Sequence, residues 1–424
     1  MLNPYPPHTA EFIVDNTVVK IPTDDEALAA LLRSSHSGDD HDLINAVKPS
    51  EAQHQQTDSD LRQRNKATSS AQTSTSDKPV SPGQLARLIK DSPFIDTQSP
   101  MTAFEVLKII TLLPWTLFRI MVATPCALLV WLSVALLVWG HPINTPLPKW
   151  RRNFLHYWLR FWTTLLVRLG LNFFTMKVTG KENIAEAYTV RPIIVFNHVS
   201  YLDGIILASV FAPTGIAKAS VASMPFFGVA TRALQFLFIL RRGTTDEQNK
   251  HVFSGNPTEK IAERAVDSRY PLFIVAPEGT TKHRHCLLTF AKGAFSAGLP
   301  VMPVLLKYRS LRFNPGWGIV YTAWHFFRVC NQYVNHLEVE VLPIYRPSAE
   351  ERQSPELYAS NVRKLMGQAL GAELSTHGIP QQQALKRNGI YVDWTGRFIR
   401  QRRHGQPTPT HVKAAAPLNH SKDS

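Results

Sequence analysis

The chain has 424 residues and a formal net charge of +14. Its length is enough for two or three domains at roughly 150 residues each, so neither a sizeable core nor an enzyme is excluded. Cys126, Cys286 and Cys330 are scattered without CxxC spacing, so neither a disulfide framework nor a thiolate zinc site is supported. The positive charge indicates an anionic partner, which could be nucleic acid, an anionic membrane or a phosphate-bearing substrate.

The first hundred residues differ in composition from the rest of the chain. Residues 36–82 are rich in Ser, Thr, Asp, Gln and His and contain hardly an aromatic residue. Such a segment buries too little apolar area to offset its chain entropy. We therefore predict that residues 1–100 are a largely disordered polar region. Residues 1–10 also lack the basic n-region and apolar core of a cleaved secretory signal.

An apolar segment follows at residues 104–140. Its second half, residues 121–140, carries no charge over about 20 positions, the length needed to cross roughly 30 Å of hydrocarbon. Its first half is interrupted by Lys108, Pro114 and Arg119. We predict a membrane segment that either crosses once or forms a re-entrant hairpin. A buried hydrophobic helix of a soluble protein is the alternative.

Basic and aromatic residues come directly after the apolar segment. Lys149, Arg151 and Arg152 place the C-terminal side in the cytosol by the positive-inside tendency. Residues 150–175 interleave aromatic rings with arginines, a pattern typical of a helix at the level of lipid headgroups. We predict an amphipathic interfacial helix there, with an internal packing helix as the alternative.

Strand-like and helix-like stretches alternate over residues 176–372. Apolar strand-like runs occur at 193–196, 215–218, 236–240, 272–276, 301–306 and 337–342. Helix-like stretches occur at 204–211, 225–234, 258–267, near 317–330 and at 355–370. This alternation predicts an α/β domain with a mainly parallel sheet and flanking helices. Residues 373–424 are predicted to be a basic, flexible tail.

A histidine and a carboxylate follow the first of these strands, in Asn197-His-Val-Ser-Tyr-Leu-Asp203. In such a strand-to-helix turn, Asp203 can accept a hydrogen bond from one ring nitrogen of His198 and fix its tautomer. The other nitrogen is then free to act as a base. Taken alone, the pair could equally be a histidine that caps the turn beside an aspartate that caps the next helix.

Two further polar clusters fall at strand ends. Arg241 follows residues 236–240, and Glu278, Gly279 and Thr280 follow residues 272–276. A glycine beside a carboxylate and a hydroxyl lets backbone amides approach an anion, and arginine holds phosphate bidentately. Taken singly, each cluster is an ordinary turn or a solvated strand end. Because the carboxyl ends of parallel strands meet at one sheet edge, together they predict a site.

Four blocks in this order resemble the glycerolipid acyltransferases of the phosphate-acceptor type. Asn197 to Asp203 is similar to their first block, His-x4-Asp, and Gly228 followed by residues 238–241 is similar to the second. Pro277-Glu-Gly-Thr280 resembles the third, and Val301-Met-Pro-Val304 the fourth. The order and spacing fit over residues 175–310. Residues 288–298, 304–308, 334–339 and 357–363 extend the resemblance to plant-type lysophosphatidylethanolamine and lysophosphatidylcholine acyltransferases.

Two positions depart from the family pattern. Members that acylate lysophosphatidic acid usually carry an arginine straight after Glu-Gly-Thr, whereas this chain has Thr281. The departure favours an acceptor with a substituted phosphate. Lys282-His-Arg-His285 also departs from the usual polar turn of the branch, which leaves the headgroup open. No calcium-binding loop of the Asp-x-Asp-x-Asp-Gly type follows.

The resemblance implies a membrane-bound O-acyltransferase of phospholipid synthesis or remodelling. It would move a fatty acyl chain from acyl-CoA to the hydroxyl of lysophosphatidylethanolamine or lysophosphatidylcholine, without a cofactor. His198 would be the base and Asp203 its partner, and the acceptor would be bound by Arg241, Glu278, Gly279 and Thr280. The expected location is the endoplasmic reticulum membrane, with the catalytic domain facing the cytosol; the oligomeric state is open.

Several alternatives stay open on the sequence. One is a 1-acylglycerol-3-phosphate acyltransferase that makes phosphatidic acid; others are a CoA-independent transacylase and a non-catalytic membrane scaffold. Ala294-Phe-Ser-Ala-Gly298 approaches Gly-x-Ser-x-Gly but begins with alanine and precedes a strand, which argues against a serine hydrolase. His283-Arg-His-Cys286 is too closely spaced for a usual tetrahedral metal site. A basic tail beside an anionic leaflet needs no nucleic-acid partner.

Overall fold

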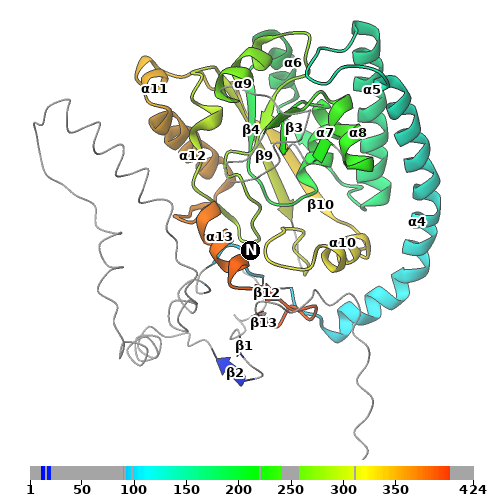
Figure 1. Cartoon of the computed structure of the whole chain (residues 1–424). Helices are drawn as coiled ribbons and strands as arrows, with labels where there is room; N and C mark the ends of the chain where they lie inside the picture. The colour runs from blue at the N-terminus through cyan, green and yellow to red at the C-terminus, as the bar shows by residue number, and fades with distance from the viewer. Residues whose placement is uncertain are drawn as a thin grey trace, which may run out of the picture.

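The structure is a computed structural model, and it describes residues 11–14, 17–20, 89, 92–96, 99–218, 221–222, 224–239, 257–309 and 312–401. The predicted disordered segment 36–82, the residues after 401 and Arg241 lie outside the described residues. Figure 1 shows the folded part of the chain as a central sheet with helices on both faces and a long helix along one side.

A five-stranded sheet forms the centre of the molecule, in the order β3-β10-β9-β4-β7. Only the β10–β9 pair is antiparallel, and the other three neighbouring pairs are parallel. This confirms the predicted α/β class with a mainly parallel sheet. The strands are β3 (Lys177–Thr179), β4 (Ile193–Phe196), β7 (Ile274–Val275), β9 (Val301–Arg309) and β10 (His336–Val341).

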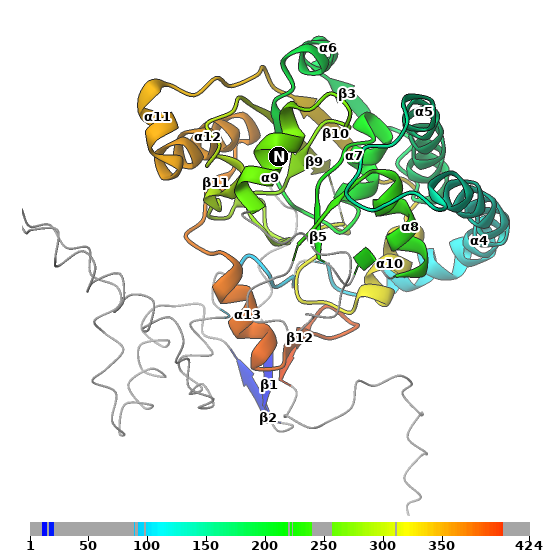
Figure 2. The same ribbon diagram turned by 45° about the horizontal axis from the view of Figure 1, so that its top comes forward.

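The apolar run of β4 is continuous because both faces of the sheet are covered. Ile194 and Phe196 pack in one core cluster and Ile193 and Val195 in another, as alternation along a strand requires. The first cluster lies against α7 (Asp203–Phe211), and the second against α9 (Pro257–Val266) and α12 (Pro355–Leu370). Figure 2 shows α7 on one side of the sheet and α9 and α12 on the other.

The remaining elements of this region complete its two layers. The predicted strands at 215–218 and 236–240 are β5 (Ile216–Lys218) and β6 (Leu237–Ile239), which pair in parallel as a separate two-stranded sheet. A bridge between Thr214 and Phe273 joins this pair to the chain before β7. The other elements are α6 (Lys181–Val190), α8 (Pro225–Ala233), β8 (Cys286–Leu287), η4 (Lys292–Ala294), α10 (Thr322–Cys330) and α11 (Ala349–Gln353).

The apolar segment is one continuous helix, α4 (Ala103–Val138), with Pro114 and Pro125 inside it. The chain makes no turn within residues 103–138, and a single crossing of the membrane stays a prediction. At 36 residues the helix is roughly 54 Å long. Only 6% of its most apolar 18-residue stretch is buried, and by length and composition the helix could cross a membrane.

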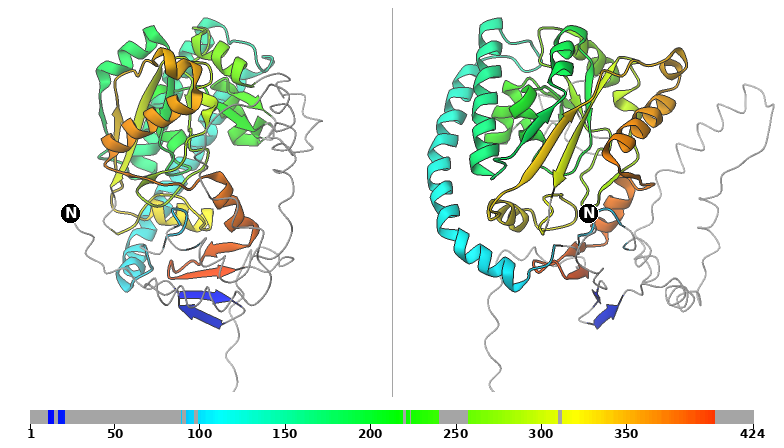
Figure 3. Two further views of the ribbon diagram at one scale, coloured as in Figure 1. Left: turned by 90° about the vertical axis from the view of Figure 1, so that its left-hand side faces the viewer. Right: turned by 180° about the vertical axis from the view of Figure 1, so that it is seen from behind.

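The polar residues that interrupt α4 face the protein. Lys108 Nζ lies 2.6 Å from Glu105 Oε1 and 2.9 Å from Gln332 Oε1. About three turns further along the helix, Arg119 Nη2 donates to the Cys330 carbonyl at 2.6 Å. At its far end Val134 and Val138 pack against α5. The helix is thus held to the domain along one face, as Figure 3 shows from behind.

The amphipathic stretch forms α5 (Lys149–Leu165), followed by a short π-helix, η2 (Leu166–Gly170). Leu155 and Leu159 are buried, whereas Trp150, Tyr157 and Phe161 are 63%, 70% and 59% exposed. The helix is therefore present and two-sided, and its place at a lipid interface stays a prediction.

The C-terminal part departs from the predicted flexible tail, which is wrong for residues 373–401. β11 (Glu373–Leu374) pairs with β8, and α13 (Ile379–Arg387) leads to β12 (Ile390–Val392) and β13 (Phe398–Gln401). The physical reason is a short apolar alternation: Ile390 and Ile399 are buried against Phe94 and Leu288. A composition average over a basic tail hides this pattern.

Part of the N-terminal region is also folded. β1 (Glu11–Val14) pairs in parallel with β13 and in antiparallel with β2 (Thr17–Lys20). The resulting sheet, β12-β13-β1-β2, is seen in the left panel of Figure 3. The prediction of disorder is therefore wrong for these two strands, which use the free edge of β13.

Candidate active site

His198 and Asp203 meet at the carboxyl end of β4. The strand ends at Phe196, the turn carries His198, and Asp203 is the first residue of α7. His198 Nδ1 lies 2.8 Å from Asp203 Oδ2. The Asp203 side chain is fully buried, whereas that of His198 is 26% exposed. The aspartate therefore faces the protein and the imidazole faces solvent.

Asp203 accepts four hydrogen bonds. Oδ2 accepts from His198 Nδ1 and from the backbone N–H groups of Val199 and Ser200, at 2.7 and 3.0 Å for the last two. Oδ1 accepts from the Tyr308 hydroxyl at 2.5 Å. These four donors fix the orientation of the carboxylate. Among the described residues, Asp203 makes no side-chain cap of α7; its carboxylate instead holds the turn before the helix and contacts the imidazole.

This arrangement suits the imidazole for proton transfer. A bond from Nδ1–H to the carboxylate places the lone pair on Nε2, the ring nitrogen without an intramolecular partner among the described residues. The Tyr308 phenol stays a donor, because burial and the Asp203 charge raise its pKa well above the usual value. The pair can thus take up and return a proton at Nε2.

Glu278 links the turn after β7 to the turn after β4. Its Oε1 accepts from the His198 backbone N–H at 2.8 Å, and its Oε2 accepts from Leu288 N–H at 2.8 Å. Lys282 Nζ lies 2.5 Å from both oxygens, and both side chains are almost completely buried. The structure thus gives Glu278 a positioning contact to His198, with both oxygens already bonded to protein groups.

Gly279 and Thr280 continue this turn under α13. Gly279 has φ +66°, and a Cβ there would lie 2.6 Å from Ile379 Cδ1. The Thr280 hydroxyl donates to Gln382 Oε1 at 2.6 Å. The left-handed conformation favours glycine at 279, and a larger residue would also have to displace the end of the Ile379 side chain. The structure brings Glu278, Gly279 and Thr280 to the edge that carries His198.

Three residues that bond to the site side chains are not among those that the sequence predicts for the site: Tyr308, Lys282 and Gln382. For Tyr308 a signal exists, because it lies four residues after Val304 and so points to the same face of β9. Phe196 pairs with Val304, which puts that face beside the end of β4. For Lys282 and Gln382 we find no comparable pattern in the sequence.

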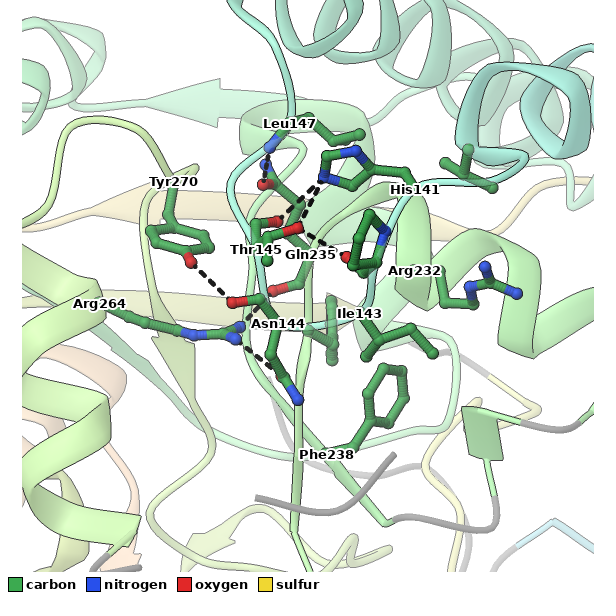
Figure 4. A pocket seen from close by; sticks show the side chains of 13 residues that line it. His141, Ile143, Asn144, Thr145, Leu147, Arg232, Gln235, Phe238, Arg264 and Tyr270 are labelled. Atoms are coloured by element: carbon green, nitrogen blue, oxygen red, sulfur yellow. Dashed lines mark hydrogen bonds between the residues drawn. The ribbon is translucent and has the colours of Figure 1, made fainter. Parts of the chain in front are cut away.

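A second polar cluster lies around the connection between α4 and α5 (Figure 4). The fully buried Arg264 donates to Asn144 Oδ1 and to the Gln235 carbonyl, both at 2.8 Å, and its guanidinium lies over the Tyr270 ring. The cavity beside it has a volume of about 20 Å³. That is room for about one water molecule, so this cluster is structural and offers no space for a substrate.

Comparison with known proteins identifies similar chains. Residues 175–307 match the Acyltransferase family model. Lysophospholipid acyltransferase LPEAT1 of Arabidopsis thaliana is 41% identical over 208 residues, 49% of this chain and 52% of that protein. LPEAT2 of the same plant is 28% identical over 286 residues, which is 67% and 51% of the two proteins. Lysophosphatidylcholine acyltransferase 1 of Mus musculus is 32% identical over 292 residues, 66% and 50%.

The chain spans about half the length of these curated relatives. Among solved structures, the crystal structure of the 1-acyl-sn-glycerophosphate (LPA) acyltransferase, PlsC, from Thermotoga maritima aligns with a TM-score of 0.41 and 20% sequence identity. The alignment covers 63% of this chain and 100% of that chain.

Proposed function

We propose that this chain, whose residues 175–307 form a domain of the acyltransferase family, transfers a fatty acyl group from acyl-CoA to the free hydroxyl of a lysophospholipid. The observation that carries the proposal is the His198–Asp203 pair, with the carboxylate buried and the imidazole open to solvent. The relatives named as lysophospholipid and lysophosphatidylcholine acyltransferases support the acceptor class.

The proposed chemistry needs a base, orientation and a place for negative charge. A glycerol hydroxyl is a poor nucleophile, and a coenzyme A thioester is already activated. His198 Nε2 takes the hydroxyl proton while the oxygen forms a bond to the thioester carbonyl carbon. The carbon–sulfur bond then breaks, and the imidazolium returns the proton to the leaving thiolate. Asp203 stabilises the imidazolium between these two steps.

The acceptor contacts are part of the proposal. Gly279, Thr280 and Arg241 would bind the glycerophosphate portion, and Glu278 acts by holding the His198 turn. Thr281, which is 4% exposed, stands where an arginine would offer a second charge to a phosphate. This supports an acceptor with a substituted phosphate, lysophosphatidylethanolamine or lysophosphatidylcholine. An acceptor of the lysophosphatidate type is the second candidate.

The proposed location is the endoplasmic reticulum membrane, with residues 176–372 as the catalytic domain on the cytosolic side. The exposed apolar surface of α4 supports membrane attachment, and Lys149, Arg151 and Arg152 support the cytosolic side. The acceptor and the product would then stay in the bilayer, and acyl-CoA would arrive from the cytosol.

The test is an acyl-transfer assay with the full chain and one labelled acyl-CoA. The acceptors are lysophosphatidylethanolamine, lysophosphatidylcholine, lysophosphatidate and glycerol 3-phosphate. We expect product with the first two, and His198→Ala should lower the rate by about 10²–10⁴-fold. Activity near wild type in that variant would overturn the mechanism, and preference for lysophosphatidate would overturn the acceptor. Product formed only from a labelled phospholipid donor would identify a transacylase.

A further inference from the structure

A cavity with basic walls lies at the edge of the sheet opposite His198. It is bounded by α5, the end of α6 and the loop before β7, and its volume is about 430 Å³. Ligand pockets are typically roughly 300–1,000 Å³, so it is large enough for a headgroup. Arg191 precedes β4 and Leu272 precedes β7, whereas His198 and Glu278 follow these strands. The cavity is therefore separate from the candidate active site.

The basic wall comes from two helices. Arg152, His156 and Arg160 are spaced i, i+4 and i+8 on α5, so they share one face of that helix. Arg191, at the end of α6, faces the same cavity. The ring centroid of His156 on α5 lies 6.3 Å from the ring centroid of Tyr188 on α6, so the two helices meet at the cavity. Among the described residues that line the cavity there is no aspartate or glutamate.

The hydrogen bonds of these arginines leave their charge uncompensated. Arg152 donates to the Arg269 carbonyl at 2.7 Å, and Arg191 donates to the carbonyls of Ala265, Tyr270 and Pro271. All these acceptors are neutral. The nearby Asp267 carboxylate is held by the Arg269 guanidinium at 2.8 Å. Several guanidinium N–H groups thus stay available around a positively charged space.

The charges act on one another across the cavity. Burial, followed by the charge of Arg160, lowers the pKa of His156. Burial is also the main cause that lowers the pKa of Arg191; the charge of Arg152 adds to it, and Asp267 acts in the opposite direction. Like charges brought together around a cavity are stabilised by an anion, and arginine binds phosphate oxygens bidentately.

The backbone at Arg191 is also unusual. Its φ is +55°, a left-handed conformation that favours glycine at the end of a helix. Three hydrogen bonds from its guanidinium hold the residue in place. Strained non-glycine residues of this kind occur preferentially at binding sites.

The surroundings of the cavity select the kind of anion. Trp150, Phe154, Tyr157 and Phe161 are exposed and form a second stripe on α5, roughly a third of a turn from the basic one. Aromatic stripes of this kind sit at the level of lipid headgroups. Tyr157 also lines the cavity, together with the apolar side chains of Leu155, Leu234 and Leu272. A ligand with a phosphate and an apolar part would satisfy both surfaces.

We infer that this cavity binds the phosphate group of an anionic membrane phospholipid, at a site apart from the one that carries His198. The inference does not depend on acyl transfer. It gives α5 two functions, with its aromatic stripe in the lipid interface and its arginines on the headgroup of a neighbouring lipid.

The test is vesicle flotation of the full chain. One set of vesicles is phosphatidylcholine alone, and the other contains about one-fifth phosphatidate as the anionic lipid. Each basic residue near an anionic surface strengthens binding about fivefold. We expect the wild type to prefer the anionic vesicles. The double variant Arg152→Gln/Arg160→Gln should lose about 25-fold of this preference. The single variant Arg160→Gln, whose guanidinium lies 3.4 Å from His156 Nε2, should lose about fivefold.

A matched control removes the same charge elsewhere. Arg309→Gln/Arg346→Gln alters two exposed arginines that pair with Glu338 and Glu186. We expect it to keep most of the preference, and equal loss in both double variants would overturn the inference. Thermal unfolding of each variant separates loss of binding from loss of fold. If coenzyme A or inorganic phosphate, but not phosphatidate vesicles, distinguishes wild type from Arg160→Gln, the ligand is a soluble phosphate and the lipid assignment is wrong.

Discussion

The Tyr308 hydroxyl donates to Asp203 Oδ1 at 2.5 Å, while His198 Nδ1 bonds the other oxygen, Oδ2, at 2.8 Å. Tyr308 is on β9 and Asp203 begins α7, so the contact joins the sheet to the helix that packs on it. Through this contact Tyr308 shares the carboxylate charge that also contacts the imidazole of His198. In the proposed mechanism Tyr308 would act as a positioning residue.

Removing the Tyr308 hydroxyl should change the pH dependence of catalysis. In Tyr308→Phe, Asp203 loses a donor and its charge is shared with fewer partners, so it binds an imidazolium more tightly. We expect kcat to fall about tenfold, equivalent to ~1.4 kcal/mol, with the KM for the acceptor unchanged. The acid limb of the kcat/KM profile should move to higher pH. The reason is that in the variant the imidazolium, which cannot act as a base, loses its proton only at a higher pH than in the wild type.

A control for this variant is available in the same chain. Tyr345 donates to Glu351 Oε1 at 2.6 Å, so it forms a similar phenol–carboxylate pair away from His198. Tyr345→Phe should leave the pH profile in place. A Tyr308→Phe enzyme with lower activity but the wild-type profile would show that Tyr308 only supports packing.

The buried pair Glu278–Lys282 should be sensitive to removal of one partner. Lys282→Met leaves the Glu278 carboxylate buried without its cation, which typically destabilises a protein by about 3–5 kcal/mol. The His198 N–H contact to Glu278 should loosen as well, so kcat should fall. The double variant Glu278→Gln/Lys282→Met should recover much of the stability, because no buried charge is left.

Unfolding midpoints and kcat of the single and double variants form the measurement. Lys292→Met, which breaks the exposed pair with Glu356, is the control and should change neither quantity. If the losses of stability in Glu278→Gln and Lys282→Met simply add in the double variant, the two side chains act independently and the positioning argument fails.

The sequence predicts the central part of this structure because its signals are local. The run Ile193–Phe196 is apolar throughout, which indicates a strand buried on both faces, and His198 and Asp203 are five residues apart on one turn. By contrast, Tyr308 reaches Asp203 from 105 positions away. Such a contact depends on strand register, which one sequence does not specify without the fold.

The ends of the chain show the same limit. β1 and β13 pair although they are separated by most of the chain, and neither strand is long enough to stand out from polar surroundings. In α4 the interruptions at Lys108 and Arg119 suggest a broken or re-entrant segment. The structure instead matches them with Gln332 and the Cys330 carbonyl, partners that only the folded domain supplies.

The protein should lose stability in mild acid through His325. This histidine is buried; its Nδ1 lies 3.1 Å from the Tyr201 hydroxyl and its Nε2 lies 3.0 Å from the Gly316 carbonyl. Burial, followed by the charge of His283, lowers its pKa from 6.5 to about 4. The unfolded chain binds a proton below about pH 6.5 and the folded chain does not, so stability falls as the pH drops from there towards 4.

At about 1.4 kcal/mol per pKa unit, His325 should contribute about 3 kcal/mol to this loss. His325→Gln should flatten the fall in the unfolding midpoint between neutral pH and pH 4, because glutamine does not titrate. The exposed His336 provides the control, and His336→Gln should leave the slope as it is. A wild-type slope in the His325 variant would show that other groups cause the acid sensitivity.

Gly279 is the position where the third block and α13 meet, and Gly279→Ala should damage both. An alanine at φ +66° is strained by about 1–2 kcal/mol, and its Cβ would lie 2.6 Å from Ile379 Cδ1. We expect a lower unfolding midpoint and weaker acceptor binding, seen as a raised KM. Adding Ile379→Ala removes the overlap but not the strain, so the midpoint should recover only in part relative to Ile379→Ala alone. Full recovery of the midpoint would show that only the overlap with Ile379 disfavours a side chain at 279. No recovery would show that only the left-handed conformation does.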